Sequence, residues 1–111
     1  MATLFVEPGA LRCELSLQAC TMVPDSLGGF SEEWTEVATV FARIEPVTAE
    51  SRFGADQTLE TVTHRIVLRR REGLASGMRF AKSGRMFDIL TVHDPDESGR
   101  YFVCRVREAG L

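Results

Sequence analysis

The chain has 111 residues, of which 44% are hydrophobic and 26% charged, and its formal net charge at pH 7 is −3. This length suffices for a single domain over residues 1–111 and is too short for two separate cores. The acidic surplus argues against a dedicated nucleic-acid-binding protein, which normally carries excess basic residues. No apolar run approaches the length of a membrane span, and residues 1–9 lack the pattern of a signal peptide, so we expect a cytoplasmic protein without membrane contact.

The cysteines indicate reduced thiols rather than a disulfide framework. Cys13, Cys20 and Cys104 are odd in number, and no two of them are close in sequence. The sequence has no C-x-x-C pair and only two histidines, His64 and His93, so we expect neither a metal site nor a cofactor.

Apolar and polar residues alternate along most of the chain, as they do in strands with one buried face. With short turns and little helix, this pattern indicates an all-β fold, a small antiparallel β-barrel or β-sandwich. In chain order, the alternation predicts about six strands, over residues 10–19, 34–45, 58–71, the two arms of a hairpin at 78–92, and 100–108.

Residues 21–33 interrupt the alternation and are predicted to be a long loop. They contain Pro24, Gly28 and Gly29, which favour turns. Loops of about a dozen residues in compact domains are often functional or mobile. Trp34 follows this loop, and we expect its ring to anchor the loop to the core rather than to serve as a ligand platform.

A second excursion from the sheet is predicted over residues 47–57. Pro46 should end the preceding strand, because proline cannot donate to a β-ladder. Thr48 is suited to cap one short helical turn that runs through Phe53 and ends at Gly54. The segment has little intrinsic structure, so we expect it to be ordered only in an assembly.

The hairpin at 78–92 has a Ser-Gly turn, in which Gly84 tolerates the positive φ that tight hairpins require. Along its second arm, Phe87, Ile89 and Thr91 share one face, and apolar residues also occupy the other face. This pattern predicts a strand covered on both sides, at the centre of the sheet.

No combination of side chains predicts catalysis. His64 lies on an apolar strand face without a nucleophile motif, which favours a structural histidine. Asp94, Asp96 and Glu97 share a turn with proline and glycine, which favours a solvated turn over a metal site. The basic run at 69–71 is interpreted as a solvated strand end that prevents edge aggregation, with a patch for DNA phosphates or an acidic partner as the alternative.

Taken together, these landmarks resemble the phage head–tail joining family, the small adaptor or stopper proteins that close a filled capsid. The resemblance extends over nearly the whole chain, from Gly9 to Glu108. It rests on Gly9-Ala10-Leu11-Arg12, Gly28-Gly29 followed by Trp34, Ala42-Arg43-Ile44-Glu45-Pro46, Thr63-His64-Arg65 with Arg69, Gly73 before Met78-Arg79, Gly84-Arg85-Met86-Phe87-Asp88-Ile89, Asp94, Cys104 and Glu108.

The resemblance implies a β-barrel that forms a homo-oligomeric ring around the DNA exit channel, between the portal or adaptor ring and the tail terminator. The particle would be a tailed phage, a prophage or a gene transfer agent, assembled in the cytoplasm. Packaged double-stranded DNA would pass without sequence-specific contacts. We expect a hexamer, with a dodecamer as the alternative, because six globules of this size leave a hole of about 34 Å that loops of about a dozen residues can close, whereas twelve leave a hole of roughly 100 Å.

The alternative function is an OB-like nucleic-acid-binding module that uses the arginine-rich strand, although most aromatic residues fall at positions expected to be buried. An enzyme is not expected. The candidate channel or inter-ring contacts are Gly28, Gly29, Glu50, Arg52, Phe53, Asp56, Arg69 and Arg71, and the candidate structural residues are Trp34, Pro46, His64 and Gly84.

Overall fold

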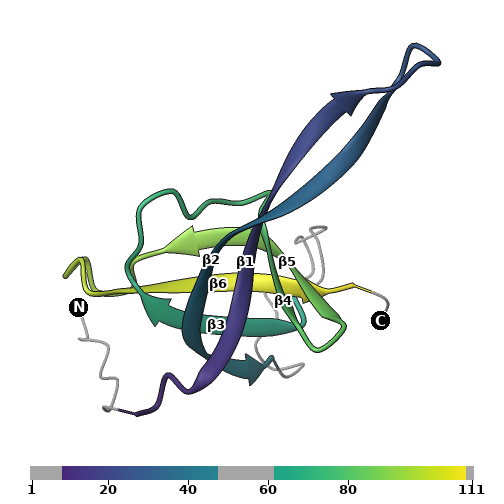
Figure 1. The fold of residues 1–111 in the computed structure, drawn as a ribbon. Coiled ribbons are helices and arrows are strands. Elements are labelled where there is room, and N and C mark those ends of the chain that lie inside the picture. Colours follow the sequence, from purple (N-terminus) through teal and green to yellow (C-terminus); the bar gives the residue numbers. More distant parts are fainter. Residues whose placement is uncertain (1–8, 48–61, 110–111) are drawn as a thin grey trace, which may run out of the picture.

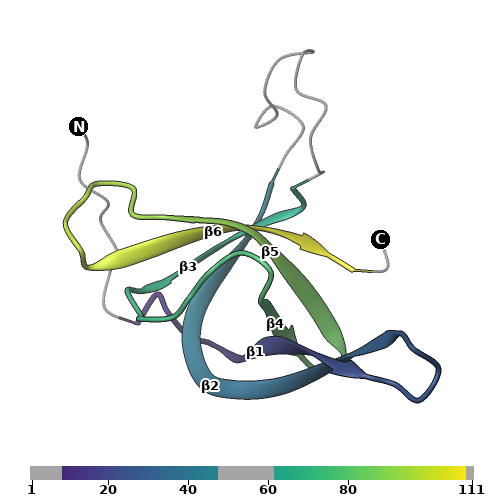
Figure 2. The same cartoon turned by 90° about the horizontal axis from the view of Figure 1, so that it is seen from above.

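A computed structural model of the chain describes residues 9–47 and 62–109, which form six strands and no helix (Figure 1). All neighbouring strands are antiparallel, and their order β1-β2-β3-β6-β5-β4 closes into a barrel (Figure 2). The predicted all-β barrel is therefore confirmed. The strands are β1 (Cys13–Pro24), β2 (Phe30–Pro46), β3 (His64–Arg69), β4 (Arg79–Lys82), β5 (Arg85–His93) and β6 (Tyr101–Glu108).

One hydrophobic core fills the barrel, because alternate side chains of every strand point inward. Phe80 and Phe87 lie directly opposite each other on β4 and β5, and both are fully buried. Burial raises the pKa of the Cys104 thiol on β6 to about 12, so this cysteine behaves as a small apolar residue. The other core residues are Leu15, Leu17, Val40, Ala42, Ile66, Leu68, Leu74, Ile89 and Val106.

The hairpin at 78–92 differs from its prediction in two respects. In a closed barrel no strand is central, and β5 buries only one face, with Phe87 and Ile89 inside. A β-bulge between Ile89 and Thr91 shifts the register, so that Thr91 is exposed and Val92 packs against the core. The expected alignment of Thr91 with Phe87 is therefore wrong, because the bulge adds one residue to β5. Gly84 does occupy a positive-φ turn, with φ of 84°.

The predicted loop at 21–33 is wrong in its extent, because most of it is strand. Beyond the barrel, β1 and β2 continue to pair from Ala19 opposite Thr35 to Pro24 opposite Phe30. We call this two-stranded projection, residues 19–35, the arm (Figure 1). Six pairs at about 3.3 Å per residue make it roughly 20 Å long.

The alternation signal fails in the arm because no core lies beneath it. In a two-stranded ribbon with both faces in solvent, neither face needs to be apolar, so apolar and polar residues do not alternate as they do in a barrel strand. The true turn is confined to residues 25–29, where the Asp25 carboxylate accepts hydrogen bonds from the backbone N–H groups of Leu27 and Gly29 at 2.8 and 2.9 Å. The projection also explains the radius of gyration of 15.4 Å, compared with about 13 Å expected for a compact chain of this length.

The arm leaves the barrel where β1 stops pairing with β4. That pairing covers only Ser16 to Gln18, and a register shift in the β1–β2 pair follows directly after Leu17. At this point the Arg79 guanidinium lies over the Trp34 ring, 4.1 Å from its centroid, and its Nε donates to Gln18 Oε1 at 2.7 Å. Trp34 is half-buried, so it packs at the base of the arm rather than inside the core.

A polar cluster joins the beginnings of β3 and β5 to the end of β6. Arg85 donates two hydrogen bonds to the Glu108 carboxylate, at 2.8 and 3.0 Å, and the His64 ring lies 4.0 Å from the same carboxylate. The Glu108 backbone N–H donates to Thr63 Oγ1 at 2.7 Å, and the His64 ring packs edge-on against Phe87. The pKa of the Glu108 carboxyl is lowered, mainly because this carboxylate accepts hydrogen bonds from Arg85.

Some predictions fall on residues that the structure does not describe. The short helix from Thr48 to Phe53 lies outside the described residues, as do the beginning of the predicted strand at 58–71 and most of the excursion at 47–57. Pro46 is the last residue of β2, paired with His64. No helix in the described part of the chain is long and apolar enough to cross a membrane.

We predict that Trp34→Ala lowers the free energy of unfolding by about 1–2 kcal/mol, less than the 3–5 kcal/mol typical of a fully buried aromatic residue. A double-mutant cycle with Arg79→Ala should give a coupling energy of about 0.5–1 kcal/mol for the stacked pair. Chemical denaturation of the four proteins measures both values. A coupling energy of zero would show that the stacking does not hold the base of the arm.

We predict that Glu108→Gln destabilises the protein at neutral pH and that the difference from wild type disappears in acid. The pKa of this carboxyl is lower in the folded chain than in the unfolded chain, so its stabilisation is complete above the unfolded pKa and is lost as pH falls through the folded pKa. Denaturation of both proteins between pH 7 and pH 2 measures the effect. A difference that does not depend on pH would contradict it.

Candidate assembly surfaces

The two faces of the arm differ in character, as the pairing register shows. Residues directly opposite each other on antiparallel strands lie on the same face. The face that continues the outer wall of the barrel therefore holds three apolar residues of the upper arm, Met22, Pro24 and Phe30, together with Glu32. The other face holds smaller or more polar residues, which are Ala19, Thr21, Val23, Ser31, Glu33 and Thr35.

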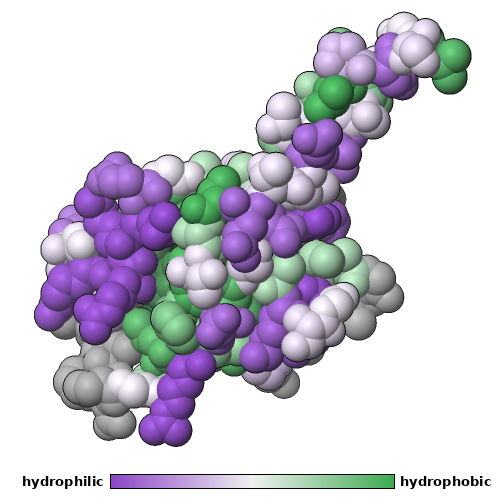
Figure 3. Space-filling view, viewed as in Figure 1, coloured by the Kyte–Doolittle hydropathy of each residue, from purple (hydrophilic) through white to green (hydrophobic). Residues whose placement is uncertain are grey.

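Large apolar side chains on this outer face are exposed to solvent. Met22 is 55% exposed and Phe30 64%, and Leu27 in the turn is 92% exposed. Figure 3 shows hydrophobic surface along the arm and at its tip, between hydrophilic patches. Clustered exposed apolar residues on a projecting element typically mark a surface that another protein covers.

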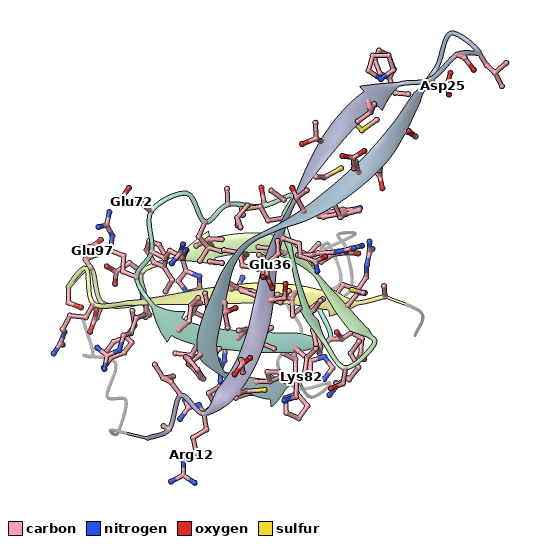
Figure 4. All side chains as sticks on the ribbon, viewed as in Figure 1. Arg12, Asp25, Glu36, Glu72, Lys82 and Glu97 are labelled. Atoms are coloured by element: carbon pink, nitrogen blue, oxygen red, sulfur yellow. The ribbon has the colours of Figure 1, made fainter. Side chains whose placement is uncertain are left out.

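The arm and the barrel segments that carry it are acidic. Residues 13–42 contain five acidic residues and no basic one. Figure 4 places Asp25 at the tip of the arm and Glu36 near its base. Within the described residues, no basic side chain forms an ion pair with a carboxylate of this segment. The acidic residues are Glu14, Asp25, Glu32, Glu33 and Glu36.

A basic groove lies on the opposite side of the barrel from the arm, where β3 ends and β6 begins (Figures 1 and 2). Its volume is about 750 Å³. Phe41, 54% exposed, contributes an aromatic wall from the middle of β2. The remaining lining residues are Gly9, Leu11, Thr39, Val40, Leu68, Arg69, Arg70, Arg71, Glu72 and Tyr101.

Two of the three arginines in the groove are available to a partner. Arg70 pairs with Glu72 at 3.3 Å and lies over the Phe102 ring, 5.7 Å from its centroid. For Arg69 and Arg71, both exposed, the described residues supply no ion-pair partner. The groove therefore combines an apolar wall with uncompensated positive charge.

The four candidate contact residues that the structure describes lie in two separate places. Gly28 and Gly29 are in the turn of the arm, and Arg69 and Arg71 line the groove, so the structure does not bring them together. The other four candidates, Glu50, Arg52, Phe53 and Asp56, lie outside the described residues.

Sequence reasoning does not identify Met22, Phe30 and Glu32 as surface residues of one face, because it assigns them to a loop, in which no face is defined. One feature of the sequence does point to this surface: residues 13–42 contain acidic residues and no basic residue, which is typical of one continuous acidic element.

The remaining candidates for chemistry have structural partners. Asp94 accepts hydrogen bonds from the backbone N–H groups of Asp96 and Gly99, which holds the β5–β6 turn. His64 belongs to the cluster around Glu108. Among residues 9–47 and 62–109, no group of three or more His, Cys, Asp or Glu side chains is placed to hold a metal ion.

Comparison with solved structures agrees with the fold. One match is a chain in the virion of a native gene transfer agent particle, with 28% identity and a TM-score of 0.68, covering 91% of this chain and 97% of that one. Another is the solution structure of protein SF1141 from Shigella flexneri 2a, with 24% identity and a TM-score of 0.74, covering 95% of this chain and 98% of that one, which supports the fold alone.

Comparison with curated proteins and with family models gives one assignment. No curated protein matches the sequence. The model of the phage head completion protein family matches residues 6–109, nearly the whole chain. The expected resemblance is thereby confirmed: the chain belongs to the phage head completion protein family and is a structural protein of the head–tail connector.

Proposed function

We propose that the chain forms a closed homo-oligomeric ring of six copies in the neck of the particle, around the exit channel for double-stranded DNA. In this position it joins the portal or adaptor ring to the tail terminator and helps to close the channel. The protein assembles in the cytoplasm, acts without catalysis and makes no sequence-specific contact with DNA. The alternative of an OB-like nucleic-acid-binding module has no support from the comparisons.

The observation that carries this proposal is the arm. It extends roughly 20 Å beyond a barrel that needs none of its residues for the core. Such an extension costs conformational entropy and exposes apolar side chains, and neither cost is offset in a monomer. In a subunit of an assembly both costs are offset, because a neighbouring protein covers the apolar side chains of the arm when it binds.

The dimensions of the chain favour six copies. Its principal extents are 52, 35 and 26 Å, with the longest extent increased by the arm. Six units about 35 Å wide leave a hole of about 35 Å, whereas twelve leave about 100 Å. A duplex is about 20 Å across, so the smaller hole is close to the width of one duplex, whereas the larger hole is about five times as wide.

We predict that excision of the arm abolishes connector function without unfolding the barrel. In the variant, an Asn-Gly turn replaces residues 21–33 and joins Cys20 to Trp34, which already lie opposite each other. The purified variant should unfold cooperatively, within a few degrees of wild type. Particles made with it should contain heads without attached tails, counted by electron microscopy.

The wild-type neck provides the reference for this experiment. Symmetry analysis of the neck by electron microscopy should show six copies of this chain in one ring. Twelve copies would contradict the stoichiometry, and normal tailed particles from the arm-less variant would contradict the role of the arm.

A further inference from the structure

The arm and the basic groove are complementary in both charge and polarity. On its outer face, the upper arm presents Met22 and Phe30 beside Glu32. The groove presents Phe41 beside two arginines, at positions 69 and 71, that have no ion-pair partner among the described residues. Contact between the two surfaces would therefore bury the apolar side chains of both and would pair the negative charge of the arm with the positive charge of the groove.

We propose that the arm of one copy lies in the basic groove of the next copy around the ring. This inference rests on the proposed ring and adds the identity of the two surfaces that hold it together. The occupant of the groove is a second copy of this chain, because the residues with the complementary charge are those of the chain's own arm.

The register of the arm decides which of its faces enters the groove. Met22 and Phe30 lie on the outer face with Glu32, whereas Glu33 lies on the opposite face. In the proposed contact, the apolar pair covers Leu11 and Phe41, and Glu32 faces the two arginines. The reverse face would bury Thr21 and Ser31 against the apolar wall and would leave both apolar residues in water.

The positions of the two surfaces suit a ring. The arm and the groove lie on opposite sides of the barrel, so the arm of one copy cannot reach the groove of the same copy (Figures 1 and 2). A contact between two different surfaces is heterologous, and it generates a closed ring when the rotation between copies divides a full turn. The same contact leaves one arm and one groove per copy occupied, with none unused.

Two other partners for these surfaces are distinguishable by experiment. The arginines of the groove are able to bind DNA phosphates, and the arm is able to bind a protein of the adjoining ring. In both cases the arm and the groove act independently, so that a defect in one is not corrected by a change in the other.

A charge exchange between the two surfaces tests the proposal. The first full-length variant carries Glu32→Arg in the arm and Glu36→Arg directly below the arm, both on the same outer face by register. The second carries Arg69→Glu and Arg71→Glu in the groove. A control variant carries Lys82→Glu and Arg107→Glu, which change the net charge by the same amount as the second variant but lie outside the arm and the groove.

Each variant is expressed in particle-producing cells that lack the wild-type chain, and tailed particles are counted by electron microscopy. The arm variant alone and the groove variant alone should each reduce tailed particles at least tenfold, because like charges then meet in every contact. Expression of both together should restore tailed particles, because each altered arm then meets an altered groove, and each native arm a native groove, in an alternating ring. The control should remain near wild type.

Two results would overturn the proposal. Failure of the two variants to restore each other assigns the surfaces to DNA or to another connector protein, and an equal loss in the control assigns the defects to net charge. Circular dichroism and thermal unfolding of each purified variant establish that the barrel is folded. A sixfold ring in the wild-type neck, combined with failure of restoration, would leave the ring proposal intact and remove only the contact between arm and groove.

A photo-crosslinking experiment locates the arm directly. Phe30→p-benzoylphenylalanine in otherwise wild-type particles should crosslink to a peptide of a second copy that contains Phe41 or residues 69–72, identified by mass spectrometry. Crosslinks to other connector proteins alone would contradict the proposal.

Discussion

The whole structure depends on the short pairing between β1 and β4, which covers only Ser16, Leu17 and Gln18. These three residues close the barrel, and without them β1 and β4 would be the two open edges of a six-stranded sheet. They also place Leu17 against Phe80 in the core. Closure thus covers the end of the core that the short strand β4 could not cover by itself.

The same short pairing also releases the arm. Because β1 is longer than β4 by eight residues, it leaves its partner while still paired with β2. The register shift beside Leu17 and the stacking of Arg79 on Trp34 both lie at this point of departure. A bulge increases the local twist of a strand pair and changes the direction of the residues beyond it. Closure of the barrel and projection of the arm are therefore two results of one mismatch in strand length.

The parts of the fold that a core imposes are predictable from the sequence. Leu15 and Leu17 alternate with polar residues because the barrel interior lies on one side of β1. On β3, Ile66 and Leu68 share the same parity and are both buried, although Val67 between them is apolar and buried as well. Where the core ends, this signal ends, so the extension of β1 and β2 into the arm has the sequence pattern of a loop. The bulge at Leu90 is also not visible in the sequence pattern. The extra residue is itself apolar, so the run of apolar residues continues, while every residue after it faces the opposite side of the strand.

The candidate site was only partly predictable for a similar reason. The arginine run at 69–71 is visible in the sequence, but the apolar wall beside it comes from Phe41 on a different strand and Leu11 before β1. Such a surface is defined by strand order, which the local pattern does not contain. The family resemblance correctly gave the connector role, and the structure adds which side chains are exposed on each side of the barrel.

The acidic character of the arm has a consequence for the protein before assembly. A two-stranded ribbon has two open edges, and two such ribbons from separate molecules can pair edge to edge into a growing sheet. Here every arm carries Asp25, Glu32 and Glu33 without a basic residue, so two arms repel each other, and Pro24 removes a donor near the tip. Newly made subunits are thereby discouraged from forming fibres through their arms, while the arm stays available to any surface of opposite charge.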